Sequence, residues 1–521
     1  MSNTDVLIVG AGPTGLTLAC DLARRGISLR IIDKSPDIQN GSRAKALQPR
    51  SLEVFDDLGI AGEMLASGKT DTIYRRFKGS QVIGESKRSD IATHRNDTAY
   101  PLSLLIPQTS VERILRAKLK ALGITVEFAK TLEGFTEEND GVLVNIGNAA
   151  NGEKLVCKYL VGCDGGHSAT RKALGIKFEG VTSETETAII GDVEVEGLTP
   201  DAWHMWLHPL YGIGIALCPL PGTNLWQLQA AAVPDSEGNA PVSCLETFNR
   251  VFQENAAMPG VILKNAGWVS TYRVNVRMAD KFKVGRIFIA GDAAHAHSIA
   301  GGLGMNTGIQ DAYNLGWKLA AVLTGAAKPK LLETYEEERL PVAAWTLNTS
   351  TARQMAVIDA SKKGQGGIES AITKDTTQLN IHFRDSSLSF DARNERGNIA
   401  AGDRAPDATC KDAATGNPIR LFDIFRGTHF TVLGFGIKYK EALTGMQDAF
   451  APMVKACLVA ASFEPGMIQV LLDNNGTAAA AYGLTEAAFV IRPDGYIGFA
   501  TCDDDSNAIA DYLGRFMKRD N

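Results

Sequence analysis

The feature that constrains this chain most is a short apolar run near its start that leads directly into a glycine-rich turn. Val6 to Val9 predicts a buried strand, Gly10 to Gly15 (GAGPTG) follows at once, and an apolar-faced helix is expected from Leu16 to Arg25. A second strand, Leu29 to Ile32, ends at Asp33. Three glycines so spaced allow a tight turn, close approach of a pyrophosphate and helix-on-strand packing, and the acid can accept hydrogen bonds from a ribose. The pattern predicts a dinucleotide-binding βαβ unit. An ordinary βαβ unit is the alternative, and the pattern does not separate FAD from NAD(P).

A second strand–loop–helix unit is expected between Arg286 and Leu323. The apolar run Ile287 to Ala290 predicts a strand, and Gly291 and Asp292 turn out of it. A loop with three further glycines then leads into a helix whose apolar residues lie three or four apart. The free N–H groups and the dipole of a helix N-terminus stabilise negative charge. Asp292 suits a hydroxyl-rich part of a ligand, such as a sugar or a ribityl chain. The unit therefore predicts a site for an electron-rich ligand, and a plain connection whose glycines only save space is the alternative.

The stretch from Val161 to Arg171 predicts a third strand, turn and helix. Asp164, Gly165 and Gly166 follow the apolar strand, and Ser168 stands at the expected helix start. A second approach to the dinucleotide would explain these residues. A helix start capped by Ser168 would explain them as well, and composition favours neither interpretation.

Length and charge limit the class of protein. A chain of 521 residues is expected to form two or three domains. Its net charge of −6 and the lack of a long basic run argue against nucleic acid and anionic membranes as partners. The eight cysteines include no CxxC pair, which favours reduced thiols and a cytoplasmic location. We find no apolar run long enough to span a membrane and no secretion signal. Arg43 and Lys45 could reach a phosphate or a flavin edge, or could be solvated surface charge.

Three motifs occur in an order that resembles a known family. They are GAGPTG at 10–15, CDGGHSATR at 163–171 and GDAAH at 291–295 with GGLGMNTGIQDAYNLGWKLA at 301–320. Together they resemble the class A FAD-dependent aromatic hydroxylases of the p-hydroxybenzoate hydroxylase-like superfamily. The phenol, chlorophenol and polyketide hydroxylase branch, which carries a C-terminal thioredoxin-like extension, is the most similar. The resemblance is strong over 1–180 and 265–350, moderate over 400–521 and weak over 181–264.

The resemblance implies an α/β fold with three parts. An FAD-binding Rossmann-like (GR2) domain would comprise 1–180 and 265–390. A mostly antiparallel substrate-binding sheet would be inserted at 181–264, with a contribution from 70–105, and a thioredoxin-like domain would follow at 391–521. In that last part Cys410, Cys457 and Cys502 stand alone, which disfavours dithiol redox chemistry. Structural support or a dimer contact is favoured instead, so a homodimer is one expected assembly.

The resemblance also implies residues for the cofactor. The pyrophosphate, ribose, ribityl and flavin contacts of FAD would come from Gly10, Gly12, Pro13, Thr14, Gly15, Asp33, Lys34, Arg43, Gln108, Asp164, Gly165, Gly291, Asp292, Gly304, Met305 and Asn306. Asp164 and Gly165 match a motif implicated in NAD(P)H contact as well. The residues from Gly304 to Asn306 would present their backbone to the flavin pyrimidine ring, where a helix N-terminus stabilises the charge of reduced flavin.

The implied reaction is hydroxylation of a phenolic or polycyclic aromatic substrate. NADPH or NADH would reduce FAD without a separate nicotinamide domain, and O2 would then give a flavin hydroperoxide that transfers an OH group to the ring. A Baeyer–Villiger or epoxidising oxygenase, an oxidase without oxygen insertion and a non-catalytic flavoprotein are the alternatives. No metal is expected, so we interpret His295 and His297 as loop packing or flavin-adjacent hydrogen bonding rather than as metal ligands.

The sequence departs from the family pattern in two places. Ser298 and Ile299 stand where relatives often carry two prolines, in a loop that lies beside the substrate in the family. Lys45 stands near the position of an aspartate that helps deprotonate the substrate in simple phenol hydroxylases. A lysine cannot be that carboxylate, so a larger or differently activated substrate is expected.

Residues 186–275 alternate strand-like runs with turns and predict the substrate-binding sheet. The candidate substrate contacts are Trp203, Trp206, Tyr211, Trp226, Gln227, Gln229, Arg273 and Ile299. By alternation Trp226 should face one side of its strand, and Gln227 and Gln229 the other. His204, His208 and Tyr272 are the candidates for a base that accepts the ring proton. For each of these residues, core or surface packing is the alternative.

Overall fold

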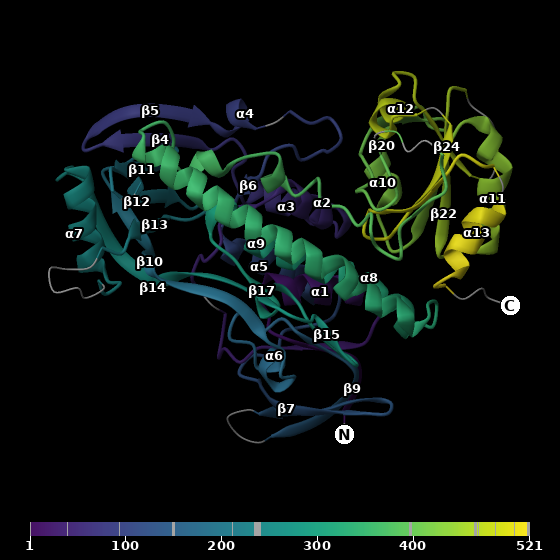
Figure 1. Cartoon of the computed structure of the whole chain (residues 1–521), viewed down its shortest axis with the longest axis horizontal. Helices are drawn as coiled ribbons and strands as arrows, with labels where there is room; N and C mark the ends of the chain where they lie inside the picture. Colours follow the sequence, from purple (N-terminus) through teal and green to yellow (C-terminus); the bar gives the residue numbers. More distant parts are fainter. Residues whose placement is uncertain are drawn as a thin grey trace.

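The computed structural model describes the chain except residues 1, 39, 93, 148–151, 211, 234–240, 395–396, 398, 463–465, 467, 485, 505 and 518–521. Three sheets organise the molecule, and the long helix α9 (Glu333–Lys362) runs diagonally from the C-terminal part, at the right of Figure 1, toward the second sheet at the left. The proline at 341 in the helical pattern of 331–347 predicts a kink or an end of the helix there. The structure shows it continuing to Lys362.

The first sheet brings distant parts of the sequence together. Its path is β15 (Lys283–Val284), β16 (Ile287–Ile289), β9 (Glu153–Gly162), β1 (Ser2–Val9) and β2 (Leu29–Ile32), with β7 (Thr131–Glu138) and β8 (Gly141–Gly147) as an antiparallel meander on β9. The strands β16, β9, β1 and β2 are parallel. Val9 pairs with Ile32 and Gly162, and Gly162 also pairs with Ile289. The loops after β1, β9 and β16 therefore leave the sheet side by side at its carboxyl edge.

Helices cover this sheet and fix the loops. The main ones are α1 (Pro13–Arg24), α2 (Pro49–Asp57), α5 (Gln108–Ala121) and α8 (Gly304–Leu323). Thr14 lies where α1 meets α8, because a Cβ at Gly308 would be 2.4 Å from its Oγ1 and a Cβ at Gly291 would be 2.5 Å from it. Close packing of α1 on α8 therefore requires glycine at both positions.

The second sheet is mostly antiparallel, as predicted. In spatial order its strands are β17 (His295–Ala296), β14 (Ile262–Ala279), β10 (Phe178–Glu196), β13 (Leu225–Ala231), β12 (Gly212–Pro219), β11 (Ala202–His208), β4 (Ile73–Lys78) and β5 (Gln81–Lys87). Only β11 and β4 are parallel among its pairs of described strands. Helix α7 (Leu245–Ala256) covers one face, where Phe248 and Phe252 pack on Trp206 and Leu228. We call this the α7 face, and the opposite one, which carries Trp203 and Cys218, the near face.

The C-terminal part has its own sheet with helices on both faces. In spatial order the strands are β18 (Phe390–Asp391), β25 (Ile497–Thr501), β24 (Ala487–Ile491), β21 (Phe430–Phe435), β22 (Val454–Ala460), β23 (Gln469–Leu472), β19 (Thr409–Asp412) and β20 (Pro418–Arg420). Helices α11 (Lys440–Ala449) and α13 (Ser506–Gly514) join one core, and α10 (Leu421–Phe425) and α12 (Thr477–Tyr482) the other. The sequence Pro-Asp-Gly at 493–495 between two apolar runs predicts a hairpin. The structure confirms it, because the Arg492–Gly495 turn joins β24 to the antiparallel β25.

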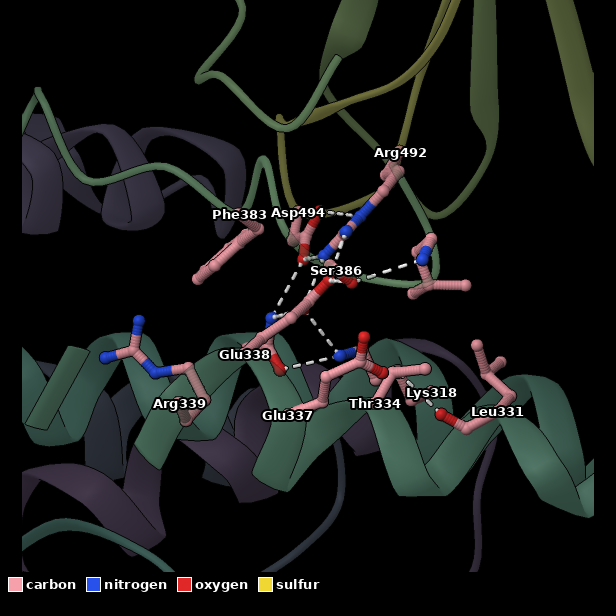
Figure 2. A network of polar contacts seen from close by, with 12 residues as sticks. Lys318, Leu331, Thr334, Glu337, Glu338, Arg339, Phe383, Ser386, Arg492 and Asp494 are labelled. Carbon is pink, nitrogen blue, oxygen red and sulfur yellow. Dashed lines mark hydrogen bonds and ion pairs between the residues drawn. The ribbon is translucent and has the colours of Figure 1, made fainter. Parts of the chain in front are cut away.

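A buried ionic cluster connects this part to the rest of the molecule (Figure 2). Both carboxylate oxygens of Glu338, on α9, accept from Arg492 of the hairpin turn, at 2.6 and 2.9 Å. Lys318, on α8, donates to Glu338 at 2.7 Å, and Arg492 also pairs with Asp494 at 2.6 Å. All four side chains are at most 1% exposed. Sequence reasoning did not foresee this cluster.

Candidate functional site

The first glycine loop lies at the carboxyl edge of the first sheet, and its three glycines serve different ends. Gly10 has a φ of +103°, and a Cβ there would lie 2.2 Å from the Cys163 carbonyl oxygen. A Cβ at Gly15 would lie 2.0 Å from the Gly10 carbonyl oxygen. A Cβ at Gly12, in contrast, would meet no atom within 4 Å. The fold therefore requires Gly10 and Gly15, whereas Gly12 leaves open space beside the backbone into which a ligand can come close.

Asp33 lies directly against this loop. Its Oδ2 accepts from the Ala11 N–H and its Oδ1 from the Ser35 N–H, both at 2.8 Å. The carboxylate is half-buried, while Lys34 beside it is exposed. An acid held in this way at the end of β2 can accept further hydrogen bonds from a sugar.

The Asp164 loop begins a capped helix and leaves one carboxylate oxygen of Asp164 without a partner among the described residues. Ser168 caps α6 (Ala169–Ala173) by accepting from the Arg171 N–H at 2.9 Å, so the capped helix start is confirmed. The Oδ2 of Asp164 accepts from Thr170 N–H and Oγ1–H, at 3.0 and 3.1 Å. Its Oδ1 is buried and has no hydrogen-bond partner among the described residues. An unsatisfied carboxylate oxygen has a free energy cost, so this atom can accept from a bound ligand.

Arg171 ties the Asp164 loop to the Gly291 turn. Its guanidinium donates to the Ala293 carbonyl oxygen at 2.8 Å. In that turn the Asp292 side chain is exposed. Desolvation by the surrounding residues raises the pKa of Asp292, whereas the positive charges of His295 and Arg43 lower it by a smaller amount. The exposed Arg43 is close enough to act on Asp292 electrostatically.

The N-terminus of α8 closes the site. Helix α8 begins at Gly304 and has no acidic residue in its first turn, so its dipole presents uncompensated positive potential. The buried Asn306 accepts from Gln48 N–H at 2.8 Å and donates to the Ala46 and Gly302 carbonyl oxygens at 2.9 and 2.7 Å. Gln108 accepts from the Ala44 N–H at 3.2 Å. The segment from 44 to 48 is therefore held alongside the helix end, with the half-buried Met305.

A buried chain of polar groups supports the loop after β16. His295 Nε2 lies 2.6 Å from Asp311 Oδ2, and His297 Nε2 lies 3.1 Å from His295 Nδ1. Asp311 also accepts from Arg339 at 2.7 Å and from the Gly291 N–H at 3.0 Å. Burial and the charge of His295 lower the pKa of His297 to about 3. These contacts agree with loop packing as the role of both histidines. The sequence reasoning missed Asp311, although an acid on the apolar stripe of an expected helix was a usable sign.

The near face of the second sheet carries a polar cluster. Gln227 donates to Ser42, and Gln229 donates to Gln227 Oε1 at 3.0 Å. Ser42 N–H and Oγ–H both donate to Asp192, at 2.8 and 2.5 Å. Lys45 donates to Gln227 and lies 4.6 Å from the centre of the Trp203 ring. Of the predicted substrate contacts, the structure therefore brings Trp203, Gln227 and Gln229 together.

Three other candidates lie on the α7 face, which corrects their assignment. The ring centres of His204 and Phe77 are 5.5 Å apart, those of His204 and Trp226 are 5.5 Å apart, and Trp206 stacks on Phe77 at 4.8 Å. His204 Nε2 lies 3.1 Å from the Thr199 carbonyl oxygen, and burial lowers the pKa of His204. A side chain in the core on the α7 face cannot contact a ligand at the near face. Alternation along the strands correctly predicts which side chains share a face of the sheet. It does not predict which of the two faces α7 covers.

The remaining candidates are dispersed. The Tyr272 hydroxyl donates to the His297 carbonyl oxygen at 3.1 Å, and burial and the charge of Asp292 raise its pKa to about 12. A phenol with this pKa is protonated at neutral pH, so its assignment as a base is corrected to that of a donor. His208 Nδ1 accepts from the Leu210 N–H at 3.2 Å at the far end of β11. Arg273 and Ile299 are exposed. Tyr211 lies outside the described residues.

Residues 3–350 match the family described as an FAD binding domain. A flavin-dependent monooxygenase of Mycobacteroides abscessus is 40% identical over 520 residues, which cover 98% of this chain and 100% of that protein. The chain belongs to the FAD-dependent aromatic hydroxylases. Pentachlorophenol 4-monooxygenase of Sphingobium chlorophenolicum is 32% identical over 519 residues, 94% of this chain and 93% of that protein. The resemblance drawn from the three motifs is confirmed, and this family member is a flavoprotein monooxygenase.

A solved structure shares the fold of this monooxygenase along almost its whole length. The ternary complex of aklavinone-11 hydroxylase with FAD and aklavinone superimposes with a TM-score of 0.84, at 24% identity and 99% coverage of each chain. Within the described residues, none of the helices is both long and apolar enough to cross a bilayer. The same residues include no group of three His, Cys, Asp or Glu side chains arranged to hold a metal ion.

Proposed function

We propose that this enzyme consumes NAD(P)H and O2 to hydroxylate a phenolic or polycyclic aromatic substrate. The reaction would take place between the start of α8 and the near face of the second sheet. One observation carries the proposal. Three loops meet at one edge of the first sheet, beside the start of α8, which has no acidic residue in its first turn. The segment from 44 to 48 lies between this helix end and the polar near face of the second sheet. The oxygen-activating route would be the one that the family resemblance implies.

The residues at the sheet edge fit FAD. Gly12 leaves free space that the pyrophosphate would occupy, and Asp33 would bind the ribose. Asp164 Oδ1 has no hydrogen-bond partner among the described residues and would accept from the cofactor. We assign the holding roles to Gly10, Gly12, Pro13, Thr14, Gly15, Asp33, Lys34, Arg43, Gln108, Asp164, Gly165, Gly291, Asp292, Gly304, Met305 and Asn306. When bound, FAD would supply hydride acceptance and oxygen activation.

The protein's own groups would position the flavin and the substrate and stabilise negative charge on the flavin. The first N–H groups of α8 would stabilise negative charge on the pyrimidine edge of the ring system. Asn306 holds the segment from 44 to 48 against that helix end, and the Tyr272 hydroxyl fixes the loop at His297. The exposed Arg43 would bind a phosphate of FAD or NAD(P)H. The sheet covered by α7 would exclude water from one side of the substrate.

Three finer assignments belong to the same proposal. The FAD-binding domain would comprise 1–180 and 265–390, and the substrate domain 181–264 with 70–105. The part from 391 to 521 would be thioredoxin-like, because its central strands are parallel on one side (β21, β22, β23) and antiparallel on the other (β24, β25). A homodimer remains a prediction. A Baeyer–Villiger or epoxidising reaction on the same scaffold is the second candidate function.

Substrate-stimulated consumption of NAD(P)H tests the proposal. The purified protein should absorb at around ~450 nm, as flavoproteins do. Pentachlorophenol and anhydrotetracycline, which relatives act on according to their names, start the substrate panel. We expect at least one aromatic compound to accelerate NAD(P)H oxidation and to gain one atom from 18O2. A protein that binds no flavin, or that oxidises NAD(P)H at the same rate with every compound, would contradict the proposal.

The replacement Tyr272→Phe tests the corrected role of Tyr272. The variant loses one hydrogen bond to His297, which has a free energy of about 0.5–1.5 kcal/mol. Turnover should fall by no more than roughly tenfold, and the acid limb of the kcat/KM profile against pH should stay where it is in the parent enzyme. Loss of that limb in the variant would restore Tyr272 as the proton acceptor.

A further inference from the structure

Lys45 is a buried cation that has no anionic partner in the part of the chain that the structure describes. Its side chain leaves the segment between β2 and β3 (Ala46–Leu47) and lies against the near face of the second sheet, with the residue only 9% exposed. The ammonium donates to the amide oxygen of Gln227 and lies over the Trp203 ring. Among the residues that the structure describes, no carboxylate is within ion-pair distance of it. Buried charges are normally paired, and an ammonium has three donors.

The nearest acid is already engaged. Both oxygens of Asp192 accept from Ser42, at 2.8 and 2.5 Å. Gln227 lies between Asp192 and Lys45, because its amide nitrogen donates to Ser42 and its oxygen accepts from Lys45. Burial lowers the pKa of Lys45 to about 8, against the opposing charges of Cys218 and Asp192. The ammonium form of Lys45 is therefore destabilised until an anion joins it.

Trp203 adds a second unsatisfied donor at the same place. This residue is 8% exposed, and its indole Nε1 is buried with no hydrogen-bond partner among the described residues. The same ring lies beneath the Lys45 ammonium. Two adjacent groups thus offer N–H donors, and Gln227 Oε1, the nearest acceptor, is shared by Lys45 and Gln229. A ligand that completes this arrangement must bring an acceptor, and a negatively charged one pairs best with Lys45.

The position of Lys45 links these donors to the reaction site. The Lys45 carbonyl oxygen accepts from the Ile106 N–H at 3.0 Å, and the next carbonyl, that of Ala46, accepts from Asn306 in the first turn of α8. Lys45 is therefore one residue along the chain from the contact that holds the helix end proposed to face the flavin, and Trp203 reaches the same place from β11.

We propose that Lys45 and Trp203 form an oxyanion subsite that binds the ionised hydroxyl of a phenol or enol. This inference rests on the proposed function and names the ionic form of its substrate. The substrate enters as the preformed anion, having lost its proton to solvent. Lys45 supplies the charge and Trp203 the directional N–H donor. The subsite replaces a general base at this position: it selects and holds the anion, which is the electron-rich form of the ring.

Equilibrium binding to the holoenzyme without NAD(P)H tests the subsite. The probes are pentachlorophenol, which is ionised at neutral pH, and its methyl ether pentachloroanisole, which cannot ionise. Perturbation of the flavin absorbance reports binding of either. Lys45→Met should weaken binding of the phenol by about 10- to 100-fold, the range for a hydrogen bond to a charged group. Binding of the ether should change by less than about threefold.

Two further variants keep the result interpretable. Lys69→Met removes a charge from an exposed lysine near the same sheet and should leave binding of both probes unchanged. Trp203→Phe keeps the ring and removes the N–H, so it should weaken the phenol by about 3- to 10-fold, and it serves as the decisive variant if Lys45→Met loses its flavin. The subsite is refuted if the parent enzyme does not prefer the phenol, or if these changes affect both probes equally. Failure of the proposed function would appear instead as absence of substrate-stimulated NAD(P)H oxidation in the parent enzyme.

Discussion

Replacement of Glu338 by alanine is expected to lower the free energy of unfolding by about 3–5 kcal/mol, the usual cost of removing one partner of a buried ion pair. The carboxylate accepts two hydrogen bonds from Arg492 and one each from Lys318, Asn314 and Ser386, at 2.6–2.9 Å. Without it, Asp494 is the one anion among the described residues that still pairs with either of the two buried cations (Figure 2). Urea denaturation of the holoenzyme at neutral pH measures the difference.

The neighbouring Glu337 provides the matched control. Its carboxylate is exposed and accepts from Ser387, so Glu337→Ala should cost less than about 1 kcal/mol. Burial by itself would raise the pKa of Glu338, but the charges of Arg492 and Lys318 outweigh burial and hold this pKa well below its usual range. Its stabilisation is therefore complete above the pKa of an unfolded glutamate, about 4.3, and is lost as the pH falls below that value. The difference between parent and Glu338→Ala should narrow in acid, and equal costs for the two replacements would contradict the role of the cluster.

Replacement of Gly12 by valine is expected to abolish retention of FAD, with an affinity loss of more than about 100-fold, while the protein stays folded. The structure has no atom within 4 Å of a Cβ at this position, so the side chain fits the empty loop. It would occupy the space that we propose for the pyrophosphate. The ratio of flavin to protein absorbance after gel filtration, with far-ultraviolet circular dichroism as the check on folding, measures both parts of the expectation.

Gly10→Ala makes the comparison informative. At Gly10 the positive φ and the 2.2 Å approach of a Cβ to Cys163 mean that the backbone itself must move. We therefore expect lower thermal stability from Gly10→Ala with or without FAD, and from Gly12→Val only loss of the stabilisation that FAD binding supplies. If Gly12→Val keeps its flavin, the loop does not hold the pyrophosphate.

Sequence reasoning was strongest where local pattern and chain geometry coincide. Three apolar runs are each followed by small residues: Val6–Val9, the run that ends at Val161, and Ile287–Ala290. Parallel pairing of such strands places the turns that follow them at one edge of the sheet. The order of the strands within the first sheet could not be derived from any one run. The Arg492–Gly495 turn was predictable because two apolar runs flank it, but its contact with α8 and α9 depends on tertiary packing.

The substrate side was predicted less well, for a physical reason. Alternation along β11 and β13 separates Trp203 from His204 and Gln227 from Trp226 correctly. Which face becomes core depends on where α7 packs, and strand residues do not encode that position. The aromatic residues Trp206 and Trp226 were taken for ligand contacts, whereas their rings serve the core beneath α7. Lys45 was noted as a departure from the family, but its missing counter-ion is visible only in three dimensions.

The charges that meet at the C-terminal hairpin divide evenly between the two sides. Helices α8 and α9 bring one lysine and one glutamate, and the turn brings one arginine and one aspartate. Each side is electrically neutral by itself, and its two charges pair with each other. The two hydrogen bonds from Arg492 to Glu338 join one side to the other. In a chimaera that takes its C-terminal region from a relative, an uncharged turn would leave the α8 and α9 side neutral. Only a donor whose turn presents arginine and aspartate in the same order would restore the bonds.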